Sequence, residues 1–254
     1  MDSDTPLIIT GMHRSGTSLL ARFVHGSGID LGNELVGAKK SNVYGHFEDA
    51  QILDFQSEIL RREYGHPMWV PGPAHPTGDD QTRALALIAT RKQKPRWGWK
   101  EPRTSLFLAF WNNLLPDAQF LFVARQPMLV MDSLSRRGST RPYQFWSHNT
   151  FLKGWLVYNR QCFEFLRDHP ARCVLVTLDQ VLQDPGTFVA LLSAWLGIEL
   201  DADLFRSMYD PAVLAQRMGR PLLVSPGLRS QCELFYAQLE HTSRQILRGE
   251  VPGR

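Results

Sequence analysis

Residues 6–24, with the sequence PLIITGMHRSGTSLLARFV, decide the fold of this chain. The apolar and β-branched residues 7–10 are typical of a buried strand, and a helix is expected to begin near Thr17. Between them, Gly11 and Gly16 give the G-x-x-x-x-G frame of a Walker A loop, which binds phosphate between a strand and a helix. Thr17, however, stands where that motif requires lysine. The stretch therefore predicts an anion-binding loop that uses a different cation.

Several groups of this loop can bind an anion. Glycine lets the backbone turn so that successive N–H groups face a ligand, and the helix adds its positive dipole end. Hydroxyl donors come from Ser15, Thr17 and Ser18, and Arg14 supplies a cation. Because a guanidinium can bridge two neighbouring anionic groups, Arg14 favours a phosphosulfate or diphosphate over ATP with magnesium. A glycine turn before a helix, with serine and threonine as caps, explains the same residues equally well.

Strand-like and helical patterns alternate along the rest of the chain. Near-continuous apolar strands that alternate with helices favour a parallel sheet covered on both faces. We therefore expect a three-layer α/β/α fold with about five parallel strands, similar to the P-loop NTPases, in a single domain over residues 1–254. Further strands are expected at residues 28–32, 96–100, 119–125 and 172–178, and helices at 47–64, 79–93, 104–115, 127–138 and 144–168, followed by two or three more.

Composition sets limits on the function. The 254 residues are 43% hydrophobic and 21% charged, which is ordinary for a globular protein, and a net charge of +3 is too small to indicate nucleic-acid binding. No apolar run is long enough to span a bilayer and no basic leader precedes the first strand, so a cytoplasmic protein is expected. Cys162, Cys173 and Cys232 form no CxxC pair, which favours reduced, buried thiols over disulfides or a zinc site.

A second anion site is predicted after the strand at residues 119–125. In parallel sheets, ligands bind at the carboxyl ends of strands, where Gly11, Lys100 and Arg125 all fall. Ser133 follows Arg125 by eight residues and lies on the next helix, so the two can converge on one phosphate if the chain doubles back. Taken alone, an arginine that caps a strand and a serine on a solvated helix face explain this pattern as well.

Three motifs together resemble the PAPS-dependent sulfotransferases, where PAPS is 3′-phosphoadenosine 5′-phosphosulfate. They are the loop after the first strand, the KEP sequence that begins at Lys100, and strand–Arg–x–Pro–x5–Ser from Arg125 to Ser133. The resemblance covers about residues 6–180 and is closest to the bacterial and Golgi-type carbohydrate and protein-tyrosine branches. It implies an enzyme that uses PAPS as co-substrate, leaves adenosine 3′,5′-bisphosphate (PAP), and requires no metal.

The resemblance also assigns residues to the nucleotide. It implies that the loop binds the 5′-phosphosulfate and that Arg125 and Ser133 bind the 3′-phosphate. A basic segment near the C-terminus often covers the nucleotide in the family, and Arg229 in residues 225–231 is the candidate in this chain. Many relatives carry lysine at the position of Arg14, and arginine cannot donate a proton at neutral pH, so its role is expected to be electrostatic. The predicted loop ligands are Gly11, His13, Arg14, Ser15, Gly16, Thr17 and Ser18.

Sulfuryl transfer is analogous to phosphoryl transfer, in which positioning and charge stabilisation dominate. Arg14 and Lys100 are the predicted cations, while Glu101 and Arg103 are expected to pair with or orient neighbouring groups. A base is needed near the acceptor hydroxyl. Glu48 is the first candidate for that base. The second is His46, and residues 44–49 can also simply begin a helix.

Two aromatic segments are candidates for the acceptor side. Rings with polar neighbours are good platforms for sugars or flat molecules, although packing of the loops explains them equally well. The first hypothesis for the acceptor is a carbohydrate or glycolipid hydroxyl. The second is a small metabolite with a hydroxyl or an amine. The aromatic and histidine residues are Tyr64, His66, Trp69, His75, Tyr143, Phe145, Trp146 and His148.

Two other functions compete with sulfuryl transfer. One is a P-loop nucleotide kinase or NTPase, and the other is an anion-binding module without catalysis.

Overall fold

The computed structural model describes residues 5–37, 45–137, 147–208 and 223–250. Within these ranges the sheet has four strands, all parallel, in the order β2-β1-β3-β4. β1 therefore lies between β2 and β3, and its carboxyl end has a neighbouring strand end on either side. The strands are β1 (Leu7–Thr10), β2 (Gly98–Lys100), β3 (Gln119–Ala124) and β4 (Cys173–Thr177).

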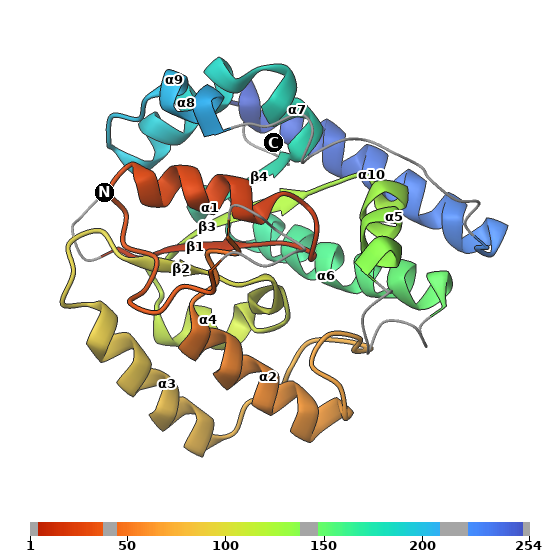
Figure 1. Cartoon of the computed structure of the whole chain (residues 1–254), viewed down its shortest axis with the longest axis horizontal. Helices are drawn as coiled ribbons and strands as arrows, with labels where there is room; N and C mark the ends of the chain where they lie inside the picture. The colour runs from red at the N-terminus through yellow and green to blue at the C-terminus, as the bar shows by residue number, and fades with distance from the viewer. Residues whose placement is uncertain (1–4, 38–44, 138–146, 209–222, 251–254) are drawn as a thin grey trace.

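Helices cover the sheet on two sides, which confirms the three-layer α/β/α fold (Figure 1). α1 lies with α8 and α9 on one side, while α4 and α6 lie on the other side with α2 and α3 beyond them. The bounds are α1 (Thr17–Gly26), α2 (Ala50–Tyr64), α3 (Gly78–Arg91), η1 (Pro102–Leu106), α4 (Leu108–Leu114), α5 (Pro127–Arg137), α6 (His148–Asp168), η3 (Pro170–Arg172), α7 (Leu178–Gln183), α8 (Pro185–Leu196), α9 (Ala202–Met208) and α10 (Pro226–Leu247).

The fifth strand, expected at residues 28–32, is reduced to one bridge beside β2. Asp30 pairs with Trp97 in parallel, and the N–H of Asp30 donates to the carbonyl of Arg96 at 2.9 Å. Gly28 and Gly32 flank this bridge at φ 93° and 126°. Because an extended strand needs negative φ values, these two glycines limit the pairing to a single residue. The expected strand count of about five is thus corrected to four within the described residues.

Two helical segments also differ from expectation. The helix expected at residues 104–115 begins instead as the short 3-10 helix η1, because Pro102 fits a first turn and the Glu101 side chain accepts from the N–H of Arg103. After β4, the described residues contain four helices rather than two or three. α7 and α8 are separate because Asp184 leaves helical geometry and caps the next helix through the N–H of Thr187.

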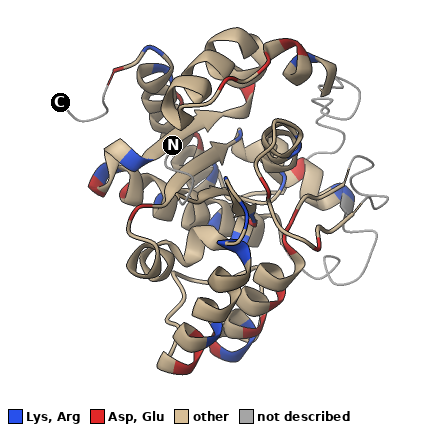
Figure 2. Ribbon diagram, turned by 90° about the vertical axis from the view of Figure 1, so that its left-hand side faces the viewer, with Lys and Arg blue, Asp and Glu red and all other residues tan. Residues whose placement is uncertain are grey.

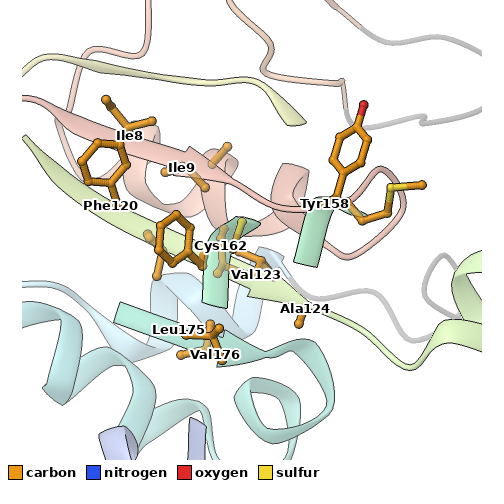
Figure 3. Packing of buried hydrophobic residues seen from close by; sticks show 14 of the residues in the cluster. Ile8, Ile9, Phe120, Val123, Ala124, Tyr158, Cys162, Leu175 and Val176 are labelled. Atoms are coloured by element: carbon orange, nitrogen blue, oxygen red, sulfur yellow. The ribbon is translucent and has the colours of Figure 1, made fainter. Parts of the chain in front are cut away.

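The core forms around the two faces of the sheet. Ile8 and Ile9 of β1 point to opposite faces and are fully buried, as expected for a strand covered on both sides (Figure 3). From α6, Tyr158 and Cys162 pack against the same sheet. All three cysteines are buried and free, and burial raises the pKa of the Cys162 thiol to about 12. The prediction that the thiols are buried is confirmed.

Charged residues form local pairs on α2 and α3. At the lower end of Figure 2, where α2 and α3 lie, acidic and basic residues alternate along the helices. Arg83 pairs with Glu58 at 2.7 Å and Arg62 with Asp80 at 2.5 Å. Among the described helices, none combines the length and the hydropathy needed to cross a bilayer.

Candidate functional site

The loop between β1 and α1 has the backbone geometry of an anion-binding turn. Gly11 has φ 147°, and a Cβ atom there would lie 2.2 Å from the carbonyl oxygen of Val123 on β3. Gly16 has φ 93°, and a Cβ atom would lie 2.7 Å from Leu178. Both positions therefore require glycine for conformation and for space. Arg14 also has a positive φ, 70°, which is uncommon for a side chain of this size and marks a loop held by its surroundings.

The loop presents donors that its own residues do not use. α1 begins without a side chain accepting from its first N–H groups, so the positive end of the helix faces the loop directly. Ser15 Oγ is fully buried and has no hydrogen-bond partner within the described residues. A buried hydroxyl without a partner is costly unless a ligand supplies one. These donors fit a phosphate or sulfate oxygen.

The two predicted anion sites meet at the same edge of the sheet. Arg14 Nε donates a hydrogen bond to Ser133 Oγ of α5 at 2.8 Å. Arg125, just past the end of β3, donates from Nη1 to the backbone carbonyl of Arg14 at 3.2 Å. Arg125 and Ser133 are 8% and 6% exposed. The chain does double back between them, so the loop cation, the strand-end arginine and the helix serine form one basic region.

The predicted lysine and the predicted base are in direct contact. Lys100, at the end of β2, donates from Nζ to Glu48 Oε1 at 2.9 Å and to the backbone carbonyl of His46 at 2.8 Å. Ser18 Oγ lies 3.3 Å from the same ammonium group and donates to the His46 carbonyl at 3.1 Å. Ser18 is predicted as a nucleotide ligand, whereas its described contacts are with Lys100 and the segment that carries Glu48. His46 Nδ1 lies 3.9 Å from Glu48 Oε1.

The charges around Glu48 keep its carboxylate ionised. Burial by itself would raise the pKa of Glu48, but the positive charges of Lys100, His13 and His46 outweigh burial and lower the pKa to about 2. His13 comes from the loop after β1, and its ring centroid lies 5.8 Å from that of Tyr158 on α6. Glu48 is thus a weak base that is fully deprotonated at neutral pH, close to a buried ammonium group.

Glu101 and Arg103 form a buried ion pair immediately after Lys100, as expected. Burial raises the pKa of Glu101, and the charge of Arg103 opposes that rise. The Arg103 Nε group donates to the backbone carbonyl of Pro67 at 2.7 Å. Tyr158 donates its hydroxyl to the next carbonyl, that of Met68, at 3.2 Å. Two hydrogen bonds therefore hold the loop at residues 65–77, one to η1 and one to α6.

Most candidate acceptor residues are engaged in packing or local hydrogen bonds. Trp69 is 8% exposed and packs on Phe151 with a centroid distance of 4.9 Å. His66 Nδ1 accepts from the N–H groups of Met68 and Trp69, and burial lowers the pKa of His66. The remaining described candidates bond as follows: Tyr64 to the Pro73 carbonyl, His75 to Glu63, and His148 to the N–H of Leu223. Tyr143, Phe145 and Trp146 lie outside the described residues.

The predicted C-terminal ligand, Arg229, takes part in none of the contacts described above. Arg229 is in the first turns of α10 and forms an exposed ion pair with Glu233, with 2.8 Å between Nε and Oε1. Its role toward a nucleotide stays a prediction.

Thr10 is a site residue that sequence reasoning missed. Its hydroxyl donates to the carbonyl of Glu101 or of Pro102, at 2.9 and 3.0 Å, and accepts from the N–H of Ser105 at 3.0 Å. The contact fixes the end of β1 to the turn after Lys100. A threonine at the end of an apolar strand carries no sequence signal for such a contact, because its partners lie far along the chain.

Comparisons with known proteins identify the family of this chain and agree with its fold. The profile described as "Sulfotransferase family" matches residues 6–202. The fold is similar to that of the sulfotransferase domain from the Synechococcus PCC 7002 olefin synthase, with 16% identity, a TM-score of 0.60, and coverage of 93% of this chain and 95% of that chain. Sulfotransferase STF1 from Mycobacterium tuberculosis has 16% identity and a TM-score of 0.54, with 91% of this chain and 76% of that chain covered. Mouse sulfotransferase SULT7A1, complexed with PAP, has 13% identity and a TM-score of 0.50, with 98% of this chain and 88% of that chain covered. No curated protein sequence gives a significant match.

Proposed function

Because the chain belongs to the sulfotransferase family, we propose that it transfers the sulfuryl group of PAPS to an acceptor hydroxyl or amine. The proposal rests on the contact between the two predicted anion sites. Arg14 donates a hydrogen bond to Ser133, and Arg125 donates one to the backbone carbonyl of Arg14. The groups assigned to the two ends of the nucleotide are therefore contiguous, and one molecule can contact both.

The proposed nucleotide contacts follow from the donors at this edge. The loop would bind the 5′-phosphosulfate through its backbone N–H groups, the Ser15 hydroxyl and the N-terminal end of α1. Arg125 and Ser133 would bind the 3′-phosphate as a guanidinium and a hydroxyl donor. Arg14 lies between these groups, so its guanidinium can contact anionic oxygens of either end. Mouse SULT7A1, which has a similar fold, is complexed with PAP, and this supports PAPS as the donor.

The proposed reaction is an in-line displacement at sulfur. The bond between sulfur and the phosphate oxygen breaks, a bond between sulfur and the acceptor oxygen forms, and PAP leaves. Negative charge then moves onto the leaving oxygen, where a cation stabilises it. Lys100 is fully buried and within reach of Glu48, which suits it to this role together with Arg14.

Glu48 is the proposed acceptor of the proton that the acceptor hydroxyl loses. A carboxylate with a pKa of about 2 is a weak base toward a free hydroxyl. As the acceptor oxygen begins to bond to sulfur, however, its proton becomes far more acidic, and a nearby carboxylate can then take it. His46 is the second candidate because its ring lies 3.9 Å from the same carboxylate.

The proposed acceptor is a carbohydrate or glycolipid hydroxyl, with a small metabolite as the second class. The loop at residues 65–77 supports an acceptor site near Glu48. Its Met68 carbonyl is held by Tyr158 of α6, whose ring lies 5.8 Å from that of His13, and His13 is close enough to Glu48 to lower its pKa. The aromatic character of this loop suits sugar rings or flat molecules. The chemical class of the acceptor rests on resemblance to the family alone.

Calorimetry of nucleotide binding tests the proposal. PAP should bind without magnesium, and Arg125→Ala should remove most of that affinity, whereas Arg83→Ala, in the exposed pair with Glu58, should leave it unchanged. Tight binding of ATP with magnesium, combined with no binding of PAP, would favour a P-loop NTPase and would overturn the proposal. PAP affinity without turnover of PAPS would leave an anion-binding module.

A further inference from the structure

A second buried ion pair lies directly next to the proposed base. Asp49 follows Glu48 in the chain and is the N-cap of α2, where its Oδ1 accepts from the N–H groups of Gln51 and Ile52 at 3.0 and 3.1 Å. Arg91, the last residue of α3, donates from Nε to Asp49 Oδ2 at 2.9 Å and from Nη2 to Oδ1 at 2.6 Å. Asp49 is 1% exposed and Arg91 6%. The Asp49 carboxylate thus caps the N-terminus of α2 and binds the last residue of α3.

The arginine is itself fixed by its own helix. Its Nη1 donates to the backbone carbonyl of Leu87 at 2.7 Å, which fixes the guanidinium plane in front of Asp49. A planar guanidinium that bonds both oxygens of a carboxylate restrains that carboxylate in distance and in orientation. Since both partners are buried, removal of either one leaves the other without its counter-charge.

The short segment that carries Glu48 is held at both ends. On one side, the His46 carbonyl accepts from Lys100 Nζ. On the other side, Asp49 is bound by Arg91. Between them, the Glu48 carbonyl accepts from the N–H of Val36 at 2.8 Å.

The backbone in this segment is strained. Phe47, immediately before Glu48, has φ 52°, a conformation that costs about 1 kcal/mol or more for a residue of this size. Such a conformation persists only where neighbouring contacts over-determine it. On the C-terminal side of the strain lie the contacts of Asp49 with Arg91 and with α2, together with the hydrogen bond from the N–H of Val36 to the Glu48 carbonyl.

We infer that Arg91 is a positioning residue for sulfuryl transfer, acting through Asp49 to hold the Glu48 carboxylate at Lys100. The inference rests on the proposed function, because it takes Glu48 as the base. Arg91 has no assigned contact with the nucleotide. Its effect should therefore fall on turnover and leave nucleotide binding unchanged.

The test compares turnover of PAPS, followed as release of PAP, with the affinity for PAP. Displacement of a reacting group by about 1 Å can cost about 100-fold in rate. Arg91→Met should therefore lower kcat by about 10- to 100-fold with an unchanged dissociation constant for PAP, and Arg91→Lys should restore part of the loss. Arg62→Met is the matched control, because it removes an arginine from Asp80 at the opposite end of α3. Unchanged kcat in Arg91→Met would overturn the inference.

A double variant separates positioning from general destabilisation. If Arg91 acts through Glu48, Arg91→Met should cause no further loss of turnover once Glu48→Gln is present. Losses that multiply would show that the two residues act independently and would contradict the inference. Asp49→Asn keeps an N-cap acceptor for α2 but removes the charge that Arg91 binds, so it should reproduce the loss in kcat even if Arg91→Met folds poorly.

Glu48→Gln alone distinguishes failure of the base from failure of the positioning role. Wild-type turnover in Glu48→Gln would remove Glu48 as the base, and the inference about Arg91 would fail with it, while PAP binding and sulfuryl transfer could still hold. A strong loss in Glu48→Gln without any loss in Arg91→Met or Asp49→Asn would remove only the positioning role.

Discussion

Arg14 and Ser133 are joined by a hydrogen bond of 2.8 Å from Nε to Oγ. The bond connects the loop after β1 to α5, two segments that lie far apart in sequence. It places the cation that replaces the usual lysine of a phosphate-binding loop against the hydroxyl assigned to the 3′-phosphate. The relationship explains why arginine suits this position, since its guanidinium can keep one N–H on Ser133 while others remain available to an anion.

Ser133→Ala should weaken PAP binding by about 10- to 100-fold, because a hydrogen bond to a charged group contributes roughly 1.5–3 kcal/mol. Calorimetry with PAP measures the effect. Ser135→Ala is the matched control, since Ser135 lies on the same helix and its hydroxyl has no hydrogen-bond partner among the described residues. Similar affinities in the two variants would remove Ser133 from the nucleotide site.

Lys100→Met should act on the chemical step. Methionine nearly fills the space of the buried side chain but supplies no charge for the leaving oxygen, so kcat should fall by about 100-fold or more while PAP affinity changes little. Single-turnover kinetics and calorimetry separate the two quantities. A near-normal kcat would exclude Lys100 from the mechanism, and a parallel loss of PAP affinity would assign it to binding.

The acid side of the pH–rate profile should distinguish the two candidate bases. The pKa of Glu48 is lowered to about 2, so this carboxylate stays ionised above that pH and its protonation should cause no loss of rate between pH 5 and 8. Loss of rate within that range would therefore indicate a base other than Glu48. An acid limb that disappears in His46→Gln would identify His46 as the base.

The same profile should change in Lys100→Met. Without the ammonium charge, burial becomes the dominant influence and the pKa of Glu48 should rise. The residual activity of this variant should then show an acid limb at higher pH than the wild type. An identical profile in both proteins would indicate that Glu48 does not titrate with the reaction.

Gly11→Ala should disrupt the loop more than the helices. Its Cβ atom would lie 2.2 Å from the Val123 carbonyl, and φ 147° is poorly accessible to alanine. PAP binding should be lost, and the temperature of unfolding should fall. Gly227→Ala, in α10, is the control because a Cβ atom there meets nothing within 4 Å. Normal PAP binding by Gly11→Ala would contradict the proposed role of the loop.

The sequence was sufficient where the signal is local. Apolar runs predicted β1, β3 and β4, and the spacing from Arg125 to Ser133 predicted two groups that the structure brings to one edge of the sheet. A full strand was predicted at residues 28–32 from their apolar and β-branched content. The structure has a single bridge at Asp30 because the flanking glycines adopt positive φ values, which their sequence does not reveal.

Contacts between distant segments were not predictable. Nothing in the sequence around Asp49 indicates that Arg91 is its partner, since an acidic residue before a helix is explained by capping alone. The contact of Ser18 with Lys100 was missed for a similar reason, because a hydroxyl in a phosphate-binding loop is assigned to the ligand by default. Such pairings depend on how whole helices pack, which no local pattern specifies.

The central place of β1 has a consequence for synthesis of the chain. Leu7 pairs with Gly98 on one side and with Gln119 on the other, so β1 leaves the ribosome well before either of its partner strands. An apolar strand without partners is prone to aggregation, and nascent chains that stop before β3 would leave at least one of its edges exposed. The loop after β1 packs against Val123, so it can reach its final conformation only after residue 124 has emerged. The proposed nucleotide binding would then be a late reporter of productive folding.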